Sequence, residues 1–396
     1  MSQAQNGAGR SAEITIVGAG IAGLSAAIEC ASEGARVRLL EAHATLGGRA
    51  RSTDGSFKAN LGPHAAYDGP FWRWLKEHEA LPAHVGPKLT ASRIRWRGEL
   101  RRTPPLGALP SVLRLRGRRA PVDEDFHGWA ASHTDETTAD MLSAGAGVYT
   151  FYHDPGSLSA AFVWPRSVRL LLSVPTVVRY PVSGWSTLVN CLERRARALG
   201  VRIQTDTPVD TLPEPPVIVA TELADAARLL GEPGLEWLSG RTICLDLGLR
   251  REKSDPSVVL DMDEAGWIGR YSTTNPSLAP DGEELVQAQM PIRPEESVEQ
   301  AGMRLEALLD TSLADWRGRV TWRRRQVMDG RSGALDPPGS TWQERPAVDR
   351  GDGVFLAGDM VAAPGLLAEV SWASAIEASH LALGALATRR PSLRAA

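Results

Sequence analysis

The chain has 396 residues, enough for about two to four domains. Its 44 Lys and Arg against 47 Asp and Glu give a formal net charge of −3, whereas dedicated nucleic-acid binders usually carry a basic surplus, so we expect no nucleic-acid partner. The three cysteines (Cys30, Cys191 and Cys244) lie far apart and form no CxxC pair, which excludes a disulfide framework and a cysteine zinc site and fits a reducing cytoplasm.

The first apolar stretch covers residues 14–28. Its 15 residues are too few to span a bilayer, which takes about 20, and no basic segment of the kind that begins a signal peptide precedes it. We therefore expect a soluble protein, and we interpret this region as a strand at 13–17, a helix at 22–33 and a second strand at 36–41. This order of elements predicts a parallel β-α-β unit.

Residues 64–180 change in character. An amphipathic helix is predicted at 70–80, and alternating Arg and apolar residues around Gly98 predict a hairpin at 93–102. The elements predicted after this region are a helix that ends at Gly200, strands at 201–205 and 217–221, a strand-rich block at 241–292, a helix at 296–317, a strand and turn that end at Asp359, and a closing helix at 369–388.

The sequence thus predicts an α/β fold of two domains. Rossmann-like pieces from discontinuous segments form a dinucleotide-binding domain, into which an α+β substrate domain is inserted. The predicted dinucleotide-binding domain comprises residues 12–63, 181–240 and 345–390. The predicted substrate-binding domain comprises residues 64–180, a helical part, and 241–344, a mixed sheet.

The segment from Gly18 to Gly23 fits the pattern G-x-G-x-x-G between a strand and a helix. The first glycine permits a tight turn, Gly20 lets the backbone approach a pyrophosphate, and Gly23 allows the helix to pack closely on the strand. The helix N-terminus also offers unpaired N–H groups and a partial positive charge to phosphates. Alone the pattern is weak, but its position in a β-α-β unit indicates a dinucleotide site.

Two further features support this site. Glu41 ends the next strand 18 residues after Gly23, near the spacing of about 20 expected for an acid that binds a ribose hydroxyl. An acid at this position disfavours a 2′-phosphate and hence NADP. Gly48 and Arg49 follow, where a forked guanidinium can neutralise a diphosphate.

Together, the glycine-rich turn, Glu41 and the segment L-G-G-R that ends at Arg49 resemble the flavin-containing amine oxidase and phytoene desaturase superfamily. Three more segments resemble it: residues 60–64, beside the flavin ring in that family; residues 183–188, before a long helix; and residues 353–359, the C-terminal FAD motif. The resemblance touches both ends and the middle of the chain. It implies a Rossmann-like FAD-binding domain with FAD as cofactor, and it says little of the substrate.

Carried over residue by residue, the resemblance implies a set of FAD-binding positions. These are Gly18, Gly20, Ile21, Ala22, Gly23, Glu41, Ala42, Gly48, Arg49, Leu61, Gly62, Pro63, Val209, Gly358, Asp359, Glu369 and Val370. In the family, the residue at Val209 packs on adenine, and the residue at Asp359 meets the ribityl or diphosphate region. This chain departs from the pattern at Ser371 and Trp372, where the family has Ser-Gly at the start of the last helix.

Other departures concern the chemistry. No cysteine follows Cys244 to match the one that tethers flavin in monoamine oxidases, so the FAD is expected to be non-covalent. Several amine oxidases of the family place a lysine over flavin N5, whereas Lys253, which lies in the strand-rich block, sits in a turn-like segment. The resemblance therefore favours desaturase-like chemistry over amine oxidation. Because no second G-x-G-x-x-G indicates an NAD(P)H site, O2 or another acceptor is expected to take the electrons.

The substrate side is less defined. His64 would lie near the flavin and either take a proton from the substrate or hydrogen-bond its own loop. Trp185, Tyr152 and Trp372 are candidates for an apolar pocket wall, with core packing as the alternative. Residues 93–119 hold nine Arg and one Glu, which favours a solvated hairpin face or a dock for anionic headgroups, so membrane-surface contact stays open. The histidines show no metal-ligand spacing, and no metal is expected.

The sequence therefore predicts an FAD-dependent oxidoreductase that takes a hydride from a C–H bond of a mainly apolar small molecule, with C–C desaturation as the first reaction type. The alternatives are FAD-dependent amine oxidation, a redox-neutral isomerisation with reduced flavin, and a non-catalytic binding protein on the same fold.

Overall fold

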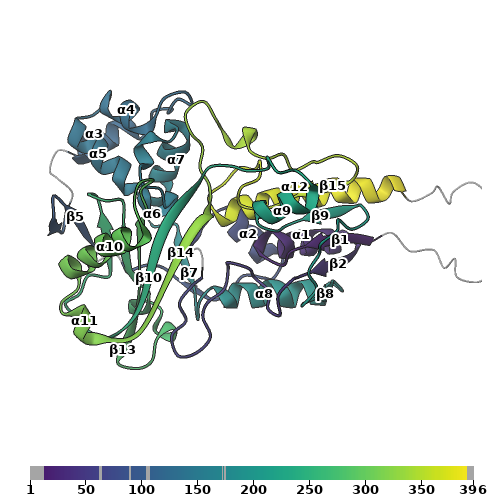
Figure 1. The fold of residues 1–396 in the computed structure, drawn as a ribbon, viewed down its shortest axis with the longest axis horizontal. Coiled ribbons are helices and arrows are strands. Elements are labelled where there is room, and N and C mark those ends of the chain that lie inside the picture. Colours follow the sequence, from purple (N-terminus) through teal and green to yellow (C-terminus); the bar gives the residue numbers. More distant parts are fainter. Residues whose placement is uncertain are drawn as a thin grey trace, which may run out of the picture.

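The computed structural model describes residues 13–61, 65–88, 91–103, 108–171, 173 and 175–389. Its elements form two regions (Figure 1). A parallel sheet with long helices forms one region, and a larger, mostly antiparallel sheet with a group of helices forms the other. The long strands β10 (Ser239–Arg250) and β14 (Val320–Ala334) run between the two.

The parallel sheet draws its strands from three stretches of the chain. They are β1 (Glu13–Val17), β2 (Arg36–Leu40), β8 (Arg202–Gln204), β9 (Val217–Val219) and β15 (Val354–Leu356). Their order is β15-β9-β1-β2-β8, and each neighbouring pair runs parallel. Central strands such as β1 and β9 are short apolar runs because both of their faces are buried.

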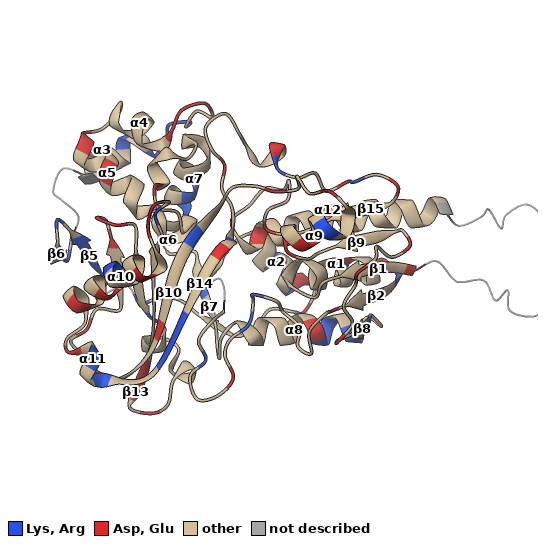
Figure 2. Cartoon of the chain, viewed as in Figure 1, with Lys and Arg blue, Asp and Glu red and all other residues tan. Residues whose placement is uncertain are grey.

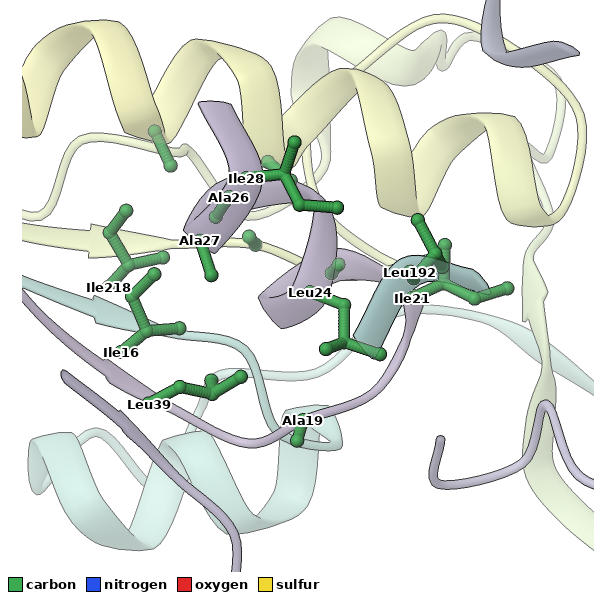
Figure 3. Packing of buried hydrophobic residues seen from close by; sticks show 14 of the residues in the cluster. Ile16, Ala19, Ile21, Leu24, Ala26, Ala27, Ile28, Leu39, Leu192 and Ile218 are labelled. Atoms are coloured by element: carbon green, nitrogen blue, oxygen red, sulfur yellow. The ribbon is translucent and has the colours of Figure 1, made fainter. Parts of the chain in front are cut away.

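Three long helices complete this region. They are α1 (Ile21–Ser32), α8 (Trp185–Ala198) and α12 (Ala368–Arg389). α1 packs against both α12 and α8. Figure 3 shows side chains of α1 between α12 and the strand residues Ile16, Leu39 and Ile218. These strand side chains are fully buried, and each such burial is worth about 1.5–3 kcal/mol of apolar transfer free energy.

The large sheet has the order β14-β10-β13-β12-β11-β5-β6. Its further strands are β5 (Arg93–Trp96), β6 (Glu99–Arg101), β11 (Val258–Asp261), β12 (Trp267–Arg270) and β13 (Glu283–Pro291). β11 and β5 run parallel, and the other neighbours run antiparallel. On β10, Ile243, Leu245 and Leu247 share an apolar core with α10 (Val298–Ser312), so the alternate residues face the parallel-sheet region.

The remaining elements lie between those already described. They are β3 (Ala66–Tyr67), α2 (Pro70–Glu77), β4 (His84–Val85), α3 (Ala108–Leu115), α4 (Phe126–Ala131), α5 (Glu136–Gly145), α6 (Gly147–Thr150), α7 (Ala160–Leu171), β7 (Val178–Pro181), α9 (Leu223–Leu230), α11 (Trp316–Arg319) and the 3-10 turns η2 (Pro155–Ser157), η3 (Tyr271–Thr273), η4 (Pro276–Leu278) and η5 (Trp342–Glu344). α3 to α7 form a helical group around the buried rings of Phe126, Trp129 and Trp164. β3, β7 and β4 form a small sheet.

The predicted α/β fold with a discontinuous Rossmann-like sheet is confirmed. The domain boundaries stay a prediction, and one helix departs from them. α2 belongs to the stretch assigned to the substrate domain, yet Phe71, Trp74 and Leu75 are buried in the core of the parallel-sheet region. A helix face rich in aromatic residues predicts burial but does not identify the surface that buries it. β14 lies outside the predicted elements.

Charged residues are interspersed over both regions (Figure 2). In the arginine-rich stretch, Arg95 pairs with the buried Asp261 at 3.1 Å and Arg101 pairs with Glu99 at 3.0 Å, so part of this charge is neutralised locally. Membrane-surface contact by this stretch stays a prediction. Within the part of the chain that the structure describes, no helix is both long enough and apolar enough to span a membrane.

Candidate functional site

A cavity of about 620 Å³ lies where the two regions meet. Its walls come from the turns after β1, β2 and β9, from residues 47–51, from the start of α12 and from the facing strands β10 and β14. Ligands of open α/β sheets bind beyond the carboxyl ends of the parallel strands, and this cavity occupies that place. Its volume also lies within the range of about 300–1,000 Å³ that is common for ligand sites.

Three glycines shape the turn between β1 and α1. Gly18 has a φ of +97°, in the left-handed region that strains other residues, and a Cβ there would lie 2.6 Å from the Ala220 carbonyl oxygen. A Cβ at Gly23 would lie 1.8 Å from the Gly18 carbonyl oxygen, so only glycine lets the helix approach the turn this closely. A Cβ at Gly20 would meet no atom within 4 Å, because this backbone borders the open cavity.

The N-terminus of α1 faces the cavity. Its N-cap residue, Gly20, has no side chain to accept from the first turn, and Gly20, Ile21 and Ala22 all line the cavity. The N–H groups of the first turn and the positive end of the helix dipole therefore favour an anion at this place.

Glu41 lies across the turn at the end of β2. Its buried carboxylate accepts hydrogen bonds from the backbone N–H groups of Ala19 at 2.8 Å and His43 at 3.0 Å. A carboxylate offers about four acceptor positions. These two bonds therefore fix the orientation of the carboxylate and leave it able to accept from a ligand hydroxyl in the cavity that it lines.

A group of charges lies farther along the cavity. Arg49 donates to Asp359 Oδ1 at 2.9 Å and to the Arg331 carbonyl oxygen, and the Arg331 guanidinium pairs with Glu222 at 2.9 Å. Burial alone would lower the pKa of Arg49, but the charges of Asp359 and Glu222 raise it by more. Arg49 is therefore a charged, forked donor that lines the same cavity as the N-terminus of α1, which suits a diphosphate.

The large sheet forms the facing wall, which the sequence analysis missed. Thr242 and Cys244 on β10 and Gln326 and Met328 on β14 line the cavity. Strand pairing sets Cys244 beside Gln326 and Thr242 beside Met328. The signal in the sequence was the alternation of Thr242, Cys244 and Asp246 with apolar residues, a period of two that indicates two different strand faces.

A buried polar network lies behind this wall. Asp246, 0% exposed, accepts from Gln287 Nε2 at 2.7 Å and from Arg324 Nε at 2.8 Å. Burial raises the pKa of Asp246, and the neighbouring Arg324 and Gln287 lower it by less. Arg324 Nη2 and Gln287 Nε2 also donate to the Asn60 carbonyl oxygen, at 2.8 and 3.3 Å. The network therefore holds the segment that leads to the cavity residue Leu61.

Known proteins with a similar sequence or fold were compared with this chain. Residues 16–78 match the model of an NAD(P)-binding Rossmann-like domain. A search of curated proteins with this sequence finds no match. Among solved structures, an oxidoreductase from Methanosarcina mazei is 18% identical and has a TM-score of 0.72, covering 93% of this chain and 100% of its own.

Two further structures match over nearly the whole chain. Cyclohexylamine oxidase from Brevibacterium oxydans IH-35A is 14% identical with a TM-score of 0.68, covering 96% of this chain and 99% of its own. A reduced UDP-galactopyranose mutase is 14% identical with a TM-score of 0.66, covering 94% and 96%. The chain has the fold that these oxidoreductase and mutase structures share. At the level of fold, the resemblance given by the sequence motifs is confirmed.

Most of the predicted FAD-binding residues line one cavity. They are Gly18, Gly20, Ile21, Ala22, Glu41, Ala42, Gly48, Arg49, Leu61, Val209, Gly358 and Asp359. Gly23 supports the turn from behind. Gly62, Pro63 and the catalytic candidate His64 lie outside the described residues.

The FAD-binding role of Glu369 and Val370 at the start of α12 stays a prediction, but neither residue lines the main cavity. The carboxylate of Glu369 is buried and accepts two hydrogen bonds of 2.6 Å from Arg169 on α7, and Val370 borders a separate small void beside the same helix. Ala368 and Ser371 line the main cavity instead. Residues three apart share a face of a helix, whereas those between are rotated by about 100° per residue, which explains the difference.

The three predicted pocket-wall residues do not line this cavity either. Trp185 is 1% exposed in the core of the parallel-sheet region, and Trp372 packs beside Phe71 with ring centres 6.2 Å apart. Tyr152 packs at the edge of the helical group. Its neighbour Phe151 lines the cavity instead, because α6 ends there in a left-handed turn with a φ of +54°.

Proposed function

We propose that this protein is an FAD-dependent oxidoreductase that removes a hydride from a C–H bond of a neutral, mainly apolar small molecule. One observation carries the proposal: a single cavity continues from a dinucleotide cradle to the wall of the large sheet. The cradle supplies contacts for a diphosphate and a ribose, and the wall leaves a place for a substrate beside the cofactor.

The residues present fit FAD. Gly20 leaves room against the backbone, and the first turn of α1 together with Arg49 matches a diphosphate. Glu41 matches a ribose hydroxyl, and Val209 supplies an apolar contact for adenine at the same end. Cys244 also lines the cavity, but burial raises the pKa of its thiol. Because the thiolate is the nucleophile, this supports a non-covalent FAD.

When bound, FAD accepts the hydride and supplies the redox chemistry. The chain's own residues hold the substrate and exclude water. Leu61, Phe151, Met328 and Leu367 border the cavity with apolar surface, and exclusion of water prevents competing reactions. A desaturation also releases a proton, for which His64 is the proposed acceptor. Electrons then leave to O2 or another acceptor.

The lining favours a neutral substrate. On the facing strands β10 and β14, the polar groups Thr242, Cys244 and Gln326 are uncharged at neutral pH, and the charged Arg331 on β14 is paired with Glu222. A cationic substrate bound against such a surface would lose its hydration without gaining a charged partner, which is costly. The lining therefore supports C–C desaturation as the first reaction type.

Amine oxidation is the second candidate, and the likeness of fold to cyclohexylamine oxidase supports it. The likeness to UDP-galactopyranose mutase gives corresponding support to a redox-neutral isomerisation.

As location we propose the cytoplasm, because the three cysteines are free and buried, as is usual in a reducing compartment.

The visible absorption spectrum of the purified protein tests the proposal, followed by anaerobic photoreduction and admission of air. We expect flavin bands, and we expect acid precipitation to release the flavin. Bands that return within seconds after air is admitted indicate an oxidase, whose substrates are then sought among neutral polyenes and amines with peroxide detection. Slow return indicates a dehydrogenase, desaturase or isomerase. A protein that stays colourless after incubation with FAD refutes the proposal and favours a binding protein.

A further inference from the structure

Gln326 lies between the cavity and the buried Asp246. It lines the cavity from β14, and its Nε2 donates to Asp246 Oδ2 at 3.4 Å. Strand pairing sets Gln326 beside Cys244, and Asp246 follows two residues later on the same face of β10. The amide of Gln326 therefore has a carboxylate on one side and the cavity on the other.

The charge of Asp246 decides which end of this amide faces the cavity. A carboxylate only accepts hydrogen bonds, so the amide end beside it must be the NH2 donor. Arg324 contacts the same carboxylate oxygen through Nε at 2.8 Å and Nη2 at 2.5 Å, which stabilises the ionised form. The amide oxygen of Gln326 is thereby turned away from Asp246.

The neighbouring polar groups of the wall either make their hydrogen bonds within the sheet or are weak hydrogen-bonding groups. The Thr242 hydroxyl lies 2.6 Å from Gln289 Oε1 and 2.9 Å from the Met290 carbonyl oxygen, so its proton is directed into the sheet. Cys244 offers a protonated thiol, which is a weak donor and a weak acceptor. Gln326 lines the cavity, and among the described side chains of Thr242, Cys244 and Gln326 its amide oxygen is the strongest acceptor.

We propose that Gln326 determines specificity by presenting its amide oxygen, oriented by Asp246, to a hydrogen-bond donor of the substrate. The substrate class is then an otherwise apolar, neutral molecule that carries an O–H or N–H group. This inference rests on the proposed function and deepens it. A site built to bond a donor rejects an analogue that lacks the donor far more strongly than an apolar pocket rejects a change in size.

The test uses the flavin-loaded protein and records the change in flavin absorption on titration with pairs of neutral probes. The pairs are cyclohexanol with methoxycyclohexane and p-cresol with 4-methylanisole, which differ by O–H against O–CH3. We expect the wild type to bind the hydroxyl member at least about tenfold more tightly, the effect of one ordinary hydrogen bond.

Three variants separate recognition from structure. Q326M removes the amide at similar length, and we expect its preference to fall below about threefold with the flavin bands unchanged. Q326H keeps a donor toward Asp246 and an acceptor toward the cavity, so we expect it to retain the preference. Q343M changes an exposed glutamine on η5 and serves as the matched control, with the full preference of the wild type.

Several results would overturn the inference alone. These are a flavin-loaded wild type that binds neither member or prefers neither, a Q326M variant with undiminished preference, and a Q326M variant whose flavin spectrum shifts while its preference is kept, since the amide would then contact the cofactor. A chain that takes up no FAD overturns the proposed function itself, and the absence of flavin bands distinguishes that failure.

Discussion

The two sheets carry their functional groups in different ways. In the parallel sheet, β1 and β9 are mostly apolar and buried, and the functional groups lie in the turns beyond the strand ends, as Gly20 and Glu41 do. In the large sheet, functional groups project from the strand faces themselves, where Cys244 and Asp246 alternate with apolar residues. The first arrangement separates ligand binding from core packing. The second places polar groups on a buried face, where each needs a partner.

This difference has an experimental consequence. Changes in the turns of the parallel sheet are expected to alter ligand binding with little loss of stability. Changes on the polar face of the large sheet are expected to alter both. Four predictions test this contrast, from the largest expected effect to the smallest.

Asp246→Asn is expected to lower the free energy of unfolding by about 3–5 kcal/mol, because it leaves the guanidinium of Arg324 beside a buried site without its counter-charge. Urea denaturation of the wild type and the variant at the same pH measures the change. The double variant with Arg324→Met is the control, and we expect it to recover a large part of the loss. An unchanged free energy of unfolding in Asp246→Asn would mean that this polar face contributes as little to stability as the turns of the parallel sheet.

Arg324→Met is expected to cost less, because Asp246 can then take up a proton. Burial already raises the pKa of Asp246 in the folded state, and losing Arg324 raises it further. The folded state then holds a proton that the unfolded state releases, so stability falls as pH rises, by up to about 1.4 kcal/mol per pH unit between the unfolded and folded pKa values. Unfolding free energies at pH 5 and pH 8 measure this, relative to the wild type. A pH-independent difference would contradict it.

Arg49→Met is expected to weaken FAD binding by about 10–100-fold, since charge-assisted hydrogen bonds are worth about 1.5–3 kcal/mol. Stability of the FAD-free chain is expected to change little. Titration of the FAD-free protein with FAD, followed by flavin fluorescence, measures the affinity. Arg251→Met, on an exposed arginine away from the cavity, is the control. Equal losses of affinity in both variants would show a general charge effect rather than a specific contact.

Ile16→Val and Ile243→Val compare the apolar core positions of the two sheets. Both side chains are buried on apolar faces, Ile16 in the parallel sheet and Ile243 in the large sheet. Each variant is expected to lose about 0.5–1.5 kcal/mol of unfolding free energy, with FAD affinity unchanged. Thermal unfolding with and without FAD measures both quantities. A clear loss of FAD affinity in Ile243→Val alone would show that the apolar face of the large sheet also shapes the site.

The same contrast explains what the sequence could reveal. Gly18 and Gly23 each meet a backbone requirement that other residues fail, and Gly20 lies between them where the backbone borders the cavity, so their spacing is visible in the sequence. Cys244 and Gln326 meet only through the pairing of two strands far apart in the chain, and many residue types fit such positions. Their alternation was visible, but not their partner or the cavity.

Two other misplacements have local causes. The start of α12 was predicted in the correct region, but the face of a helix depends on where its first turn begins, and Ala368 and Ser371 took the places expected for Glu369 and Val370. Trp185 belongs to a recognisable segment, yet a large apolar ring is equally suited to a pocket wall and to a core. The packing of α8 against α1 decides for the core.

The paired strands β10 and β14 also have a mechanical meaning. Their ladder extends from Leu249 and Val320 to Ser239 and Ala334, where the Ala334 N–H donates to the Asp359 carbonyl oxygen. This two-stranded ladder joins the wall formed by β10 and β14 to the charges near Arg49. A hinge motion between the two regions would have to bend the two strands or separate them, which breaks backbone hydrogen bonds. This ladder therefore resists a change in the spacing between the two halves of the site.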